Sequence, residues 1–262
     1  MEFAGAIGDD AFGRRVLADF AGAGVGTRGV RLTDTPTCQV MAIVEPDGER
    51  SLVVWPPDGG ALVDFRAADL DTGLIAGAVW LHVTGMCLRH EPVRSAVLAA
   101  MAAARAASIP VSIDLNLRVE LWGLDAARRA VVEAAVALAD VVLAQGDEEL
   151  IPLTGAPDVA SAARLLANGE RTVVARLGAG GALAIAPYGV VLAAPAFAVI
   201  QVNPIGAGDA FNGGFIAARV EGRPLAEALR WGNAVGACKV ASPGGARDLP
   251  DRTAMEAMLA HG

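Results

Sequence analysis

Cysteine and histidine are scarce in this sequence, and long apolar runs are absent. The three cysteines, Cys38, Cys87 and Cys238, are odd in number, lie far apart and form no Cys-x-x-Cys pair, so we expect neither a disulfide framework nor a zinc knuckle. The three histidines show no metal-ligand spacing. No run approaches the roughly 18 apolar residues of a membrane span, and Met1 is not followed by a signal-peptide pattern. These absences predict a cytoplasmic protein with reduced cysteines and no membrane partner.

Positive charge is also in short supply. The chain has 21 Lys and Arg against 29 Asp and Glu, a net charge of −8, and its basic residues form no cluster. Such a surface does not neutralise nucleic-acid phosphates or anionic lipid, so any anionic ligand must be bound locally. With 262 residues, 54% of them hydrophobic, the chain can bury a sizeable core. We predict a single packed domain over residues 1–262.

Two kinds of pattern alternate along most of the chain. Short β-branched runs are separated by stretches with apolar residues at three- and four-residue spacing, which is the spacing of crossover helices. This alternation is typical of a parallel sheet covered on both faces. The predicted strands are Ala78 to Val83, Pro110 to Ile113, Val141 to Leu143 and Thr172 to Ala175, and the predicted helices are Pro92 to Ala107, Asp125 to Ala139 and Pro157 to Asn168.

Two pairs of β-patterned runs indicate hairpins. Gln39 to Val44 and Ser51 to Trp55 are joined by Glu45 to Glu49, a turn built on Asp-Gly. This hairpin is either an antiparallel edge extension of the main sheet or a lid over a ligand site, and the sequence leaves both open. A second hairpin is predicted from Ala182 to Ala186 and Val190 to Ala194, followed by a last strand over Phe197 to Val202.

The segment from Val202 to Gly214 combines a strand end, a glycine-rich turn and a helix start. We predict the helix over Ala210 to Val220. The backbone amides of Gly206, Ala207 and Gly208 would then lie at a helix N-terminus, where unsatisfied donors and the helix dipole favour an anion. The sequence therefore predicts a local anion-binding site.

Asp209 directly follows this turn. It either caps the helix, a common role of aspartate, or acts as a general base that takes the proton of an attacking hydroxyl. In the second case the adjacent amides would stabilise charge on a transferring phosphoryl group. Both roles need a carboxylate beside a bare helix end. Gly213 and Gly214 weaken the helix that follows, which predicts a close approach to its backbone.

Four motifs resemble those of the ribokinase (PfkB) family of carbohydrate kinases. Gly206 to Phe215 is similar to the family's C-terminal Gly-Ala-Gly-Asp signature, and Gly5 to Gly13 is similar to its N-terminal Gly-x-x-Gly-x-Asp-x-x-Gly segment. Asp114 to Trp122 resembles the Asp-x-Asn-x-Arg...Leu-Trp stretch of the sugar-acid and fructose kinases. Glu149 to Gly155 resembles the end of the Asn-x-x-Glu...Leu-Thr-Gly segment. The motifs follow the family's order along essentially the whole chain.

The resemblance implies a ribokinase-like α/β fold, a three-layer α/β/α sandwich with a mostly parallel sheet and a small lid hairpin over about residues 37–57. It also implies ATP-dependent phosphorylation of a primary hydroxyl on a small sugar, with magnesium, and relatives commonly form homodimers through the lid strands. The pattern of Asp114, Asn116, Arg118 and Trp122 favours 2-keto-3-deoxygluconate or fructose as acceptor; ribose stays open and adenosine is disfavoured. The alternative is a truncated, weakly active or inactive sugar- or nucleotide-binding protein of the same fold.

The resemblance also assigns roles to individual residues. Asp209 would be the general base beside an anion hole of Gly206, Ala207 and Gly208. Glu149 would organise magnesium, its alternative being an ordinary solvated helix carboxylate. The residues expected at the nucleotide are Arg176, Gly178, Gly180, Asn233 and Gly236, and those expected at the substrate are Asn116, Arg118 and Gly85. The alternatives are a helix-packing amide for Asn233 and a plain turn for Gly178 and Gly180.

Three departures from the family pattern bear on this assignment. The chain begins almost directly at Phe3, whereas relatives usually have a further strand and a Gly-Gly...Asn segment ahead of this point that contact the sugar. Asn203 takes the place of an aspartate that belongs to the family's monovalent-cation site, which speaks against potassium activation, and Pro204 removes one amide donor. Gly146 takes the place of the asparagine in the Asn-x-x-Glu element, so magnesium would depend on Glu149, with Glu148 or Asp147 as candidates to assist it.

Overall fold

The computed structural model describes residues 1–44, 50–244 and 248–261. The chain divides into two compact units, Met1–Ala78 with Cys87–Ile109 and Val79–Met86 with Pro110–Gly262. The expectation of a single domain remains a prediction. Cys38, Cys87 and Cys238 are free thiols. Within the described ranges, no helix combines the length and the apolar character that a membrane span requires.

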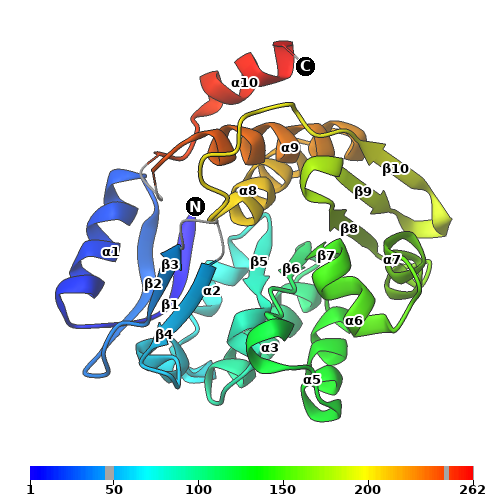
Figure 1. Ribbon diagram of the computed structural model, residues 1–262. Helices are drawn as coiled ribbons and strands as arrows, with labels where there is room; N and C mark the ends of the chain where they lie inside the picture. The colour runs from blue at the N-terminus through cyan, green and yellow to red at the C-terminus, as the bar shows by residue number, and fades with distance from the viewer. Residues whose placement is uncertain (45–49, 245–247, 262) are drawn as a thin grey trace. The chain divides into compact units, whose positions relative to one another are not determined.

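The first unit contains two small sheets and the helices packed with them (Figure 1). Its elements are β1 (Glu2–Gly8), α1 (Ala11–Gly22), β2 (Gly26–Thr33), β3 (Gln39–Val44), β4 (Arg50–Trp55), α2 (Thr72–Ala76) and α3 (Val93–Ala106).

The parallel pair of β1 and β2 is followed by a turn that Asp10 fixes. The Asp10 carboxylate accepts hydrogen bonds from the amide of Thr37 at 2.7 Å, from its hydroxyl at 2.9 Å and from the Gly13 amide at 2.8 Å, the last of which caps α1. These donors, the Thr37 amide foremost, hold the pKa of Asp10 below its usual value. A Cβ at Gly13 would lie 2.0 Å from the Gly8 carbonyl oxygen. The packing of this turn therefore requires glycine at position 13.

The predicted hairpin strands are confirmed as β3 and β4, which pair antiparallel from Gln39 opposite Trp55 to Val44 opposite Arg50. They form a two-stranded sheet of their own, so the alternative of an edge extension of the main sheet is wrong. The predicted Asp-Gly turn over residues 45–49 lies outside the described residues. The role of this hairpin as a lid stays a prediction.

The second unit carries the main sheet and the C-terminal helices (Figure 1). Its elements are β5 (Leu81–Thr84), β6 (Val111–Asp114), α4 (Val119–Trp122), α5 (Ala126–Ala137), β7 (Val141–Gln145), α6 (Ile151–Thr154), α7 (Val159–Ala167), β8 (Thr172–Arg176), β9 (Ala182–Ile185), β10 (Val191–Ala194), α8 (Ala207–Val220), α9 (Leu225–Ala241) and α10 (Arg252–His261).

The main sheet has the strand order β10-β9-β8-β7-β6-β5 within the described residues. Strands β5 to β8 pair in parallel, and β9 and β10 continue the sheet antiparallel. The four β-branched runs predicted as strands are confirmed here, and so is the second hairpin. The parallel arrangement brings the carboxyl ends of β5 to β8 to one edge, where open α/β sheets bind their ligands.

Both faces of the main sheet are covered, as the predicted α/β/α sandwich requires. On one face, Leu143 and Val174 belong to a buried cluster with Phe215 of α8 and residues of α9 and α10. Side chains alternate along a strand, so Val173 and Ile185 point to the other face, and they are 0% and 1% exposed. Helix α7 packs against β8 and β9. This burial stabilises the sheet that positions the candidate site.

The predicted strand over Phe197 to Val202 is wrong. Residues 195–206 contain neither helix nor strand, and Ile200 is 85% exposed. The amides of Val202 and Asn203 both donate to the carbonyl oxygen of Val240, at 2.9 and 3.0 Å, so this segment lies on the end of α9. The apolar run has the composition of a strand, but among the described residues it pairs with no strand.

The two glycines inside α8 have different surroundings. A Cβ at Gly214 would lie 2.7 Å from Val235 Cγ2 and 2.9 Å from the Trp231 carbonyl oxygen, so α9 approaches the helix as predicted. A Cβ at Gly213 would meet nothing within 4 Å. The predicted close approach is therefore confirmed for Gly214; no other part of the described chain approaches Gly213, where it stays a prediction.

These surroundings predict opposite effects of the same substitution on stability. We expect Gly214→Ala to lower the free energy of unfolding by about 1–3 kcal/mol, because α9 must give way. Gly213→Ala should raise it by roughly 0.5–1 kcal/mol through helix propensity alone. Chemical denaturation of the two variants measures both effects, and equal effects would contradict the packing of α8 on α9.

Candidate active site

Asp209 lies within the first turn of α8, which begins at Ala207, three residues before the predicted start. The N-cap residue is Gly206, whose φ of 80° lies in the left-handed region that favours glycine. As a glycine, Gly206 supplies no side-chain cap to the helix. Asp209 therefore does not serve as the N-cap, and the structural alternative for this residue is wrong.

The N-terminus of α8 presents amides that can receive an anion. No acceptor among the described residues takes the amides of Gly206, Gly208 or Asp209, whereas the Ala207 amide donates to the Pro204 carbonyl oxygen at 3.2 Å. Open amides at the positive end of a helix dipole favour a negatively charged ligand. The predicted anion hole is thus supported at Gly206 and Gly208, while the Ala207 amide is used within the turn.

A buried polar cluster lies beside the first turns of α8, built around Arg176 at the end of β8. The Arg176 guanidinium binds both carboxylate oxygens of Asp114, at the end of β6, at 2.9 and 3.1 Å. It also donates to the Asn212 carboxamide oxygen at 2.7 Å, and Asn212 donates to Asp114 at 2.7 Å. The side chains of Arg176 and Asp114 are 11% and 6% exposed. The cluster therefore joins the ends of two strands to α8.

Glu149 extends this cluster from a π-helical turn over Gly146–Leu150, after β7. Its two oxygens accept hydrogen bonds from the amides of Leu117 at 2.6 Å and Gln145 at 2.7 Å, and Arg176 lies 3.7 Å away. Burial and Asp114 raise the pKa of Glu149, and the two amides and Arg176 oppose the rise. The carboxylate is buried and holds the ends of β6 and β7 together, so the solvated-carboxylate alternative is wrong.

The loop after β6 is held in a strained conformation. Asn116 and Arg118 have φ values of 40° and 49°, in the left-handed region that costs a residue with a side chain about 1–2 kcal/mol. Leu117 between them is 1% exposed; its amide donates to Glu149 and its carbonyl oxygen accepts from Arg128. Strain of this kind persists only where the surroundings enforce it, and it is concentrated at functional sites. The predicted substrate residues are thus fixed at the edge where open α/β sheets bind their ligands, and their contact with a substrate stays a prediction.

Gly85 faces the same loop from the end of β5. A Cβ at Gly85 would lie 2.0 Å from the Leu115 carbonyl oxygen, so backbone packing alone requires this glycine. Asn116 lies within 3.5 Å of the Thr84 hydroxyl. The structure therefore places Gly85 near the loop of Asn116 and Arg118, and its contact with a substrate stays a prediction.

The charges around Asp209 determine how strongly it holds a proton. Burial raises the pKa of Asp209 and the negative charge of Asp114 adds to the rise, whereas Arg176 and Arg118 lower it. Burial also disfavours the charge of Arg176, but Asp114, Glu149 and Asp209 outweigh it and raise the pKa of this guanidinium. Arg176 at the end of β8 therefore keeps a permanent positive charge near Asp209.

Arg176 also lies against the anion hole. Its guanidinium carbon is 3.5 Å from the position that a Cβ would take at Gly208, which is ordinary van der Waals contact. Its Nε is buried without a hydrogen-bond partner in the described part of the chain. The predicted contact of Arg176 with the nucleotide stays a prediction, and the structure shows its guanidinium engaged with Asp114 and Asn212.

The other residues predicted at the nucleotide lie on α9 and in the turn after β8. Asn233 donates two hydrogen bonds to the carbonyl oxygens of residues 194 and 195, at 3.0 and 2.9 Å, which is the helix-packing alternative. Gly236 faces the start of α8, since a Cβ at this position would lie 3.5 Å from the Ala207 carbonyl oxygen. Gly178 and Gly180 are exposed in the turn between β8 and β9. Their contacts with a nucleotide stay predictions.

Sequence reasoning did not assign Asn212 or Asp114 to the site. Both lie inside quoted motifs, and Asn212 follows Asp209 by three residues, which places the two on the same face of α8. That spacing is the signal that could have identified Asn212. Nothing in the sequence shows that Asp114 and Arg176 form a buried pair.

The donors present fit a magnesium ion that arrives with phosphate groups. The described residues form no group of three or more His, Cys, Asp or Glu side chains that could hold a metal. Mg²⁺ usually keeps several waters and takes one or two carboxylates together with phosphate oxygens, so it does not need such a group. Both oxygens of Glu149 already accept amides, which fits an indirect role through water.

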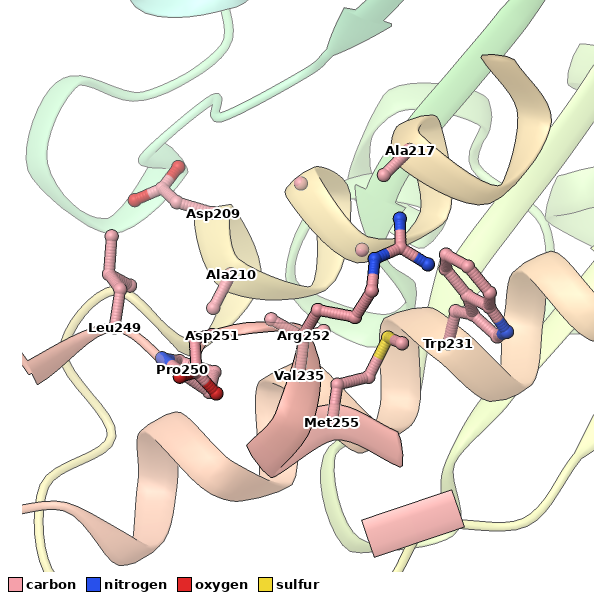
Figure 2. Close-up of a pocket in the computed structure, with 12 residues that line it drawn as sticks. Asp209, Ala210, Ala217, Trp231, Val235, Leu249, Pro250, Asp251, Arg252 and Met255 are labelled. Atoms are coloured by element: carbon pink, nitrogen blue, oxygen red, sulfur yellow. The ribbon is translucent and has the colours of Figure 1, made fainter. Parts of the chain in front are cut away.

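A cavity of about 360 Å³ lies beside Asp209, between α8, α9 and the start of α10 (Figure 2). Its lining is mostly apolar, and it includes Gly213 and Trp231. The Arg252 guanidinium lies 5.1 Å from the centre of the Trp231 ring and is paired with Glu221. This cavity offers few polar partners for the hydroxyls of a sugar. The candidate site is therefore the polar end of α8, with Asp209, the open amides and the Arg176 cluster.

Comparisons with known proteins agree along the chain. A model described as pfkB family carbohydrate kinase matches residues 1–252. A fructokinase from Vibrio alginolyticus is 32% identical over 259 residues, which cover 96% of this chain and 83% of the relative. A 5-dehydro-2-deoxygluconokinase from Photobacterium profundum is 27% identical over 255 residues, covering 95% and 77%. The crystal structure of a fructokinase from Vibrio cholerae O395 in a fructose, ADP and calcium ion bound form matches with a TM-score of 0.86 and 30% identity, covering 98% of this chain and 85% of the other.

Proposed function

Because the chain belongs to the pfkB family of carbohydrate kinases, we propose that it transfers the terminal phosphoryl group of ATP to a primary hydroxyl of a small sugar or sugar acid. The favoured acceptors are 2-keto-3-deoxygluconate and fructose, with ribose next. One observation carries the proposal: Asp209 lies in the first turn of an uncapped helix, with the open amide of Gly208 beside it. A base and an anion site at one helix end suit phosphoryl transfer.

Asp209 is proposed to take the proton of the acceptor hydroxyl. Its raised pKa makes the ionised carboxylate a stronger proton acceptor than an aspartate in water. The amides of Gly206 and Gly208 would stabilise the negative charge of the transferring phosphoryl group. Arg176 holds α8 in position through its hydrogen bond to Asn212. Magnesium bound together with ATP would supply positive charge that neutralises part of the charge of the phosphate groups. Glu149 is the carboxylate expected to orient the water around that ion.

Arg118 supports an acidic acceptor. Its charge lowers the pKa of Asp209, so the two side chains act on one another in the same site. Its side chain is exposed at the end of the strained loop, whereas the Arg176 guanidinium is engaged in the buried cluster. A guanidinium binds a carboxylate through two parallel hydrogen bonds, which a neutral sugar cannot reproduce. Arg118 is therefore the residue that would favour 2-keto-3-deoxygluconate over fructose.

The role of Arg118 predicts a substrate-selective defect. We expect Arg118→Ala to raise KM for 2-keto-3-deoxygluconate by about ten- to a hundred-fold, the size of a lost charged hydrogen bond, and to leave KM for fructose almost unchanged. Arg164→Ala, which removes an exposed arginine from α7, is the matched control and should change neither value. Equal effects of Arg118→Ala on the two acceptors would remove the reason to prefer a sugar acid.

Acceptor-dependent ADP formation by the purified chain, with ATP and magnesium, tests the proposal as a whole. Nucleotide binding without turnover on any sugar would favour the alternative, an inactive sugar- or nucleotide-binding protein of the same fold.

A further inference from the structure

Lys239 is the only lysine in the chain, beside 20 arginines, and it is buried. Its side chain is 2% exposed in the last turn of α9. A lysine is almost never fully buried without a partner, because its ammonium group loses its hydration. The partner that the described residues supply is a carbonyl oxygen, that of Gly244, to which the ammonium donates at 2.8 Å. The chain therefore keeps its single lysine ammonium group on a backbone oxygen inside the protein.

The lysine side chain runs against the loop of the anion hole. Its Cε lies 3.9 Å from the position that a Cβ would take at Gly206, the N-cap residue of α8. The same loop is tied to the segment after α9 by Asn203, which donates to the Pro243 carbonyl oxygen at 3.3 Å and accepts from the Ile205 amide at 3.0 Å. The carbonyl oxygens of Pro243 and Gly244 thus both receive nitrogen donors, one of which is charged.

The chemistry of these contacts is that of a bound monovalent cation. An ammonium group and a potassium ion carry the same charge, and backbone carbonyl oxygens bind both. We propose that the ammonium of Lys239 is a built-in cation of the anion-hole loop. It joins the Gly206 turn to the segment after α9 and adds positive charge behind the amides that receive the phosphoryl group. Lys239 is thus a positioning residue, and the chain needs no added monovalent cation; its effect on catalysis rests on the proposed function.

The first test separates turnover from acceptor binding. With choline chloride as the only salt, we expect Lys239→Met to lower kcat roughly ten-fold, less than the loss of a direct oxyanion donor, with little change in KM for the sugar. Lys239→Arg, which keeps the charge, should retain more activity than Lys239→Met. Arg230→Ala removes an exposed charge from the same helix and is the matched control, with unchanged kcat. A folded Lys239→Met with the kcat of the unmodified protein would overturn the proposal.

The second test is rescue by free cations. Lys239→Ala leaves space where the ammonium lay, so potassium or ammonium chloride should restore its kcat at constant ionic strength. The unmodified protein should not respond, and Lys239→Met should not respond either, because the methionine side chain fills the space. A response of all three proteins to potassium, or of none, would overturn the inference.

The third test does not depend on activity, so its failure can be told apart from a failure of the proposed function. Potassium or ammonium chloride should raise the unfolding temperature of Lys239→Ala in a saturable manner compared with choline chloride, and should not do so for the unmodified protein. If the variants do not fold, ¹⁵N-lysine labelling of the unmodified protein gives one ammonium signal, because there is one lysine. That signal should shift when a non-hydrolysable ATP analogue binds with magnesium, and an unchanged signal with the analogue bound would contradict the proposal.

Discussion

Asp209→Asn is expected to reduce kcat by a factor on the order of a hundred or more while the fold and the affinity for ATP stay nearly unchanged, because a carboxamide cannot take a proton from the acceptor. The substitution keeps the size of the side chain and the open amides of α8. Asp209 caps no helix, so its loss should cost little stability. Steady-state kinetics with ATP and each acceptor, together with calorimetric binding of ATP, measure the two sides of this prediction.

The control for this variant is Asp158→Asn, which makes the same chemical change at the N-cap of α7. Asparagine is as good an N-cap residue as aspartate, so neither stability nor turnover should change. Normal turnover by Asp209→Asn would show that Asp209 is not the base. A loss of ATP binding along with turnover would instead assign Asp209 to the nucleotide.

The buried pair of Arg176 and Asp114 predicts two opposite shifts in the pH profile. Asp209 must be ionised to act, so kcat falls as the pH drops through its raised pKa. Arg176 favours the ionised form, so Arg176→Gln should raise the pKa of Asp209 further and move the acid limb of kcat to higher pH. The negative charge of Asp114 disfavours the ionised form of Asp209, so Asp114→Asn should move the acid limb of kcat to lower pH. Shifts in the same direction, or none, would contradict the electrostatic role of the pair.

The same cluster predicts a large loss of turnover at the optimum pH. Arg176 holds α8 through Asn212, and a displacement of about 1 Å in the reacting groups costs on the order of a hundred-fold in rate. Removing one partner of a buried ion pair also costs about 3–5 kcal/mol of stability, so thermal unfolding must accompany the kinetics. Arg176→Lys keeps the charge and should lower kcat without moving the acid limb.

Arg171→Gln is the matched control for Arg176→Gln. Arg171 precedes the other end of β8, its side chain is 14% exposed, and it donates to the Leu166 carbonyl oxygen at 2.9 Å. Its loss should reduce stability without changing the pH profile. A similar shift of the acid limb in both variants would mean that the shift reports general destabilisation.

Much of the fold could be predicted because hydrophobic periodicity decides it locally. The four parallel strands and the two hairpins are short apolar runs between clear turn signals, and both kinds of signal depend only on neighbouring residues. The run from Phe197 to Val202 has the same composition, yet it lies on the end of α9. Whether a run finds a partner strand depends on the rest of the chain, so composition could not decide it.

The part of the candidate site that lies within a single motif could be predicted from the sequence. A glycine-rich turn before a helix presents open amides, and Asp209 follows it directly. The roles of Arg176 and Glu149 depend on three strand ends that meet only in the folded sheet. Lys239 could not be assigned from the sequence for the same reason, since the residues beside it on α9 predict neither its burial nor its hydrogen bond to Gly244.

The most direct test of the account is ADP formation by the purified 262-residue chain with ATP and magnesium, across 2-keto-3-deoxygluconate, fructose, ribose and adenosine, with Asp209→Asn beside it. The account predicts turnover that depends on a sugar or sugar acid, is greatest with 2-keto-3-deoxygluconate or fructose, and falls at least about a hundred-fold in the variant. Turnover that is the same in both proteins, or no turnover on any sugar while nucleotide is bound, would contradict it.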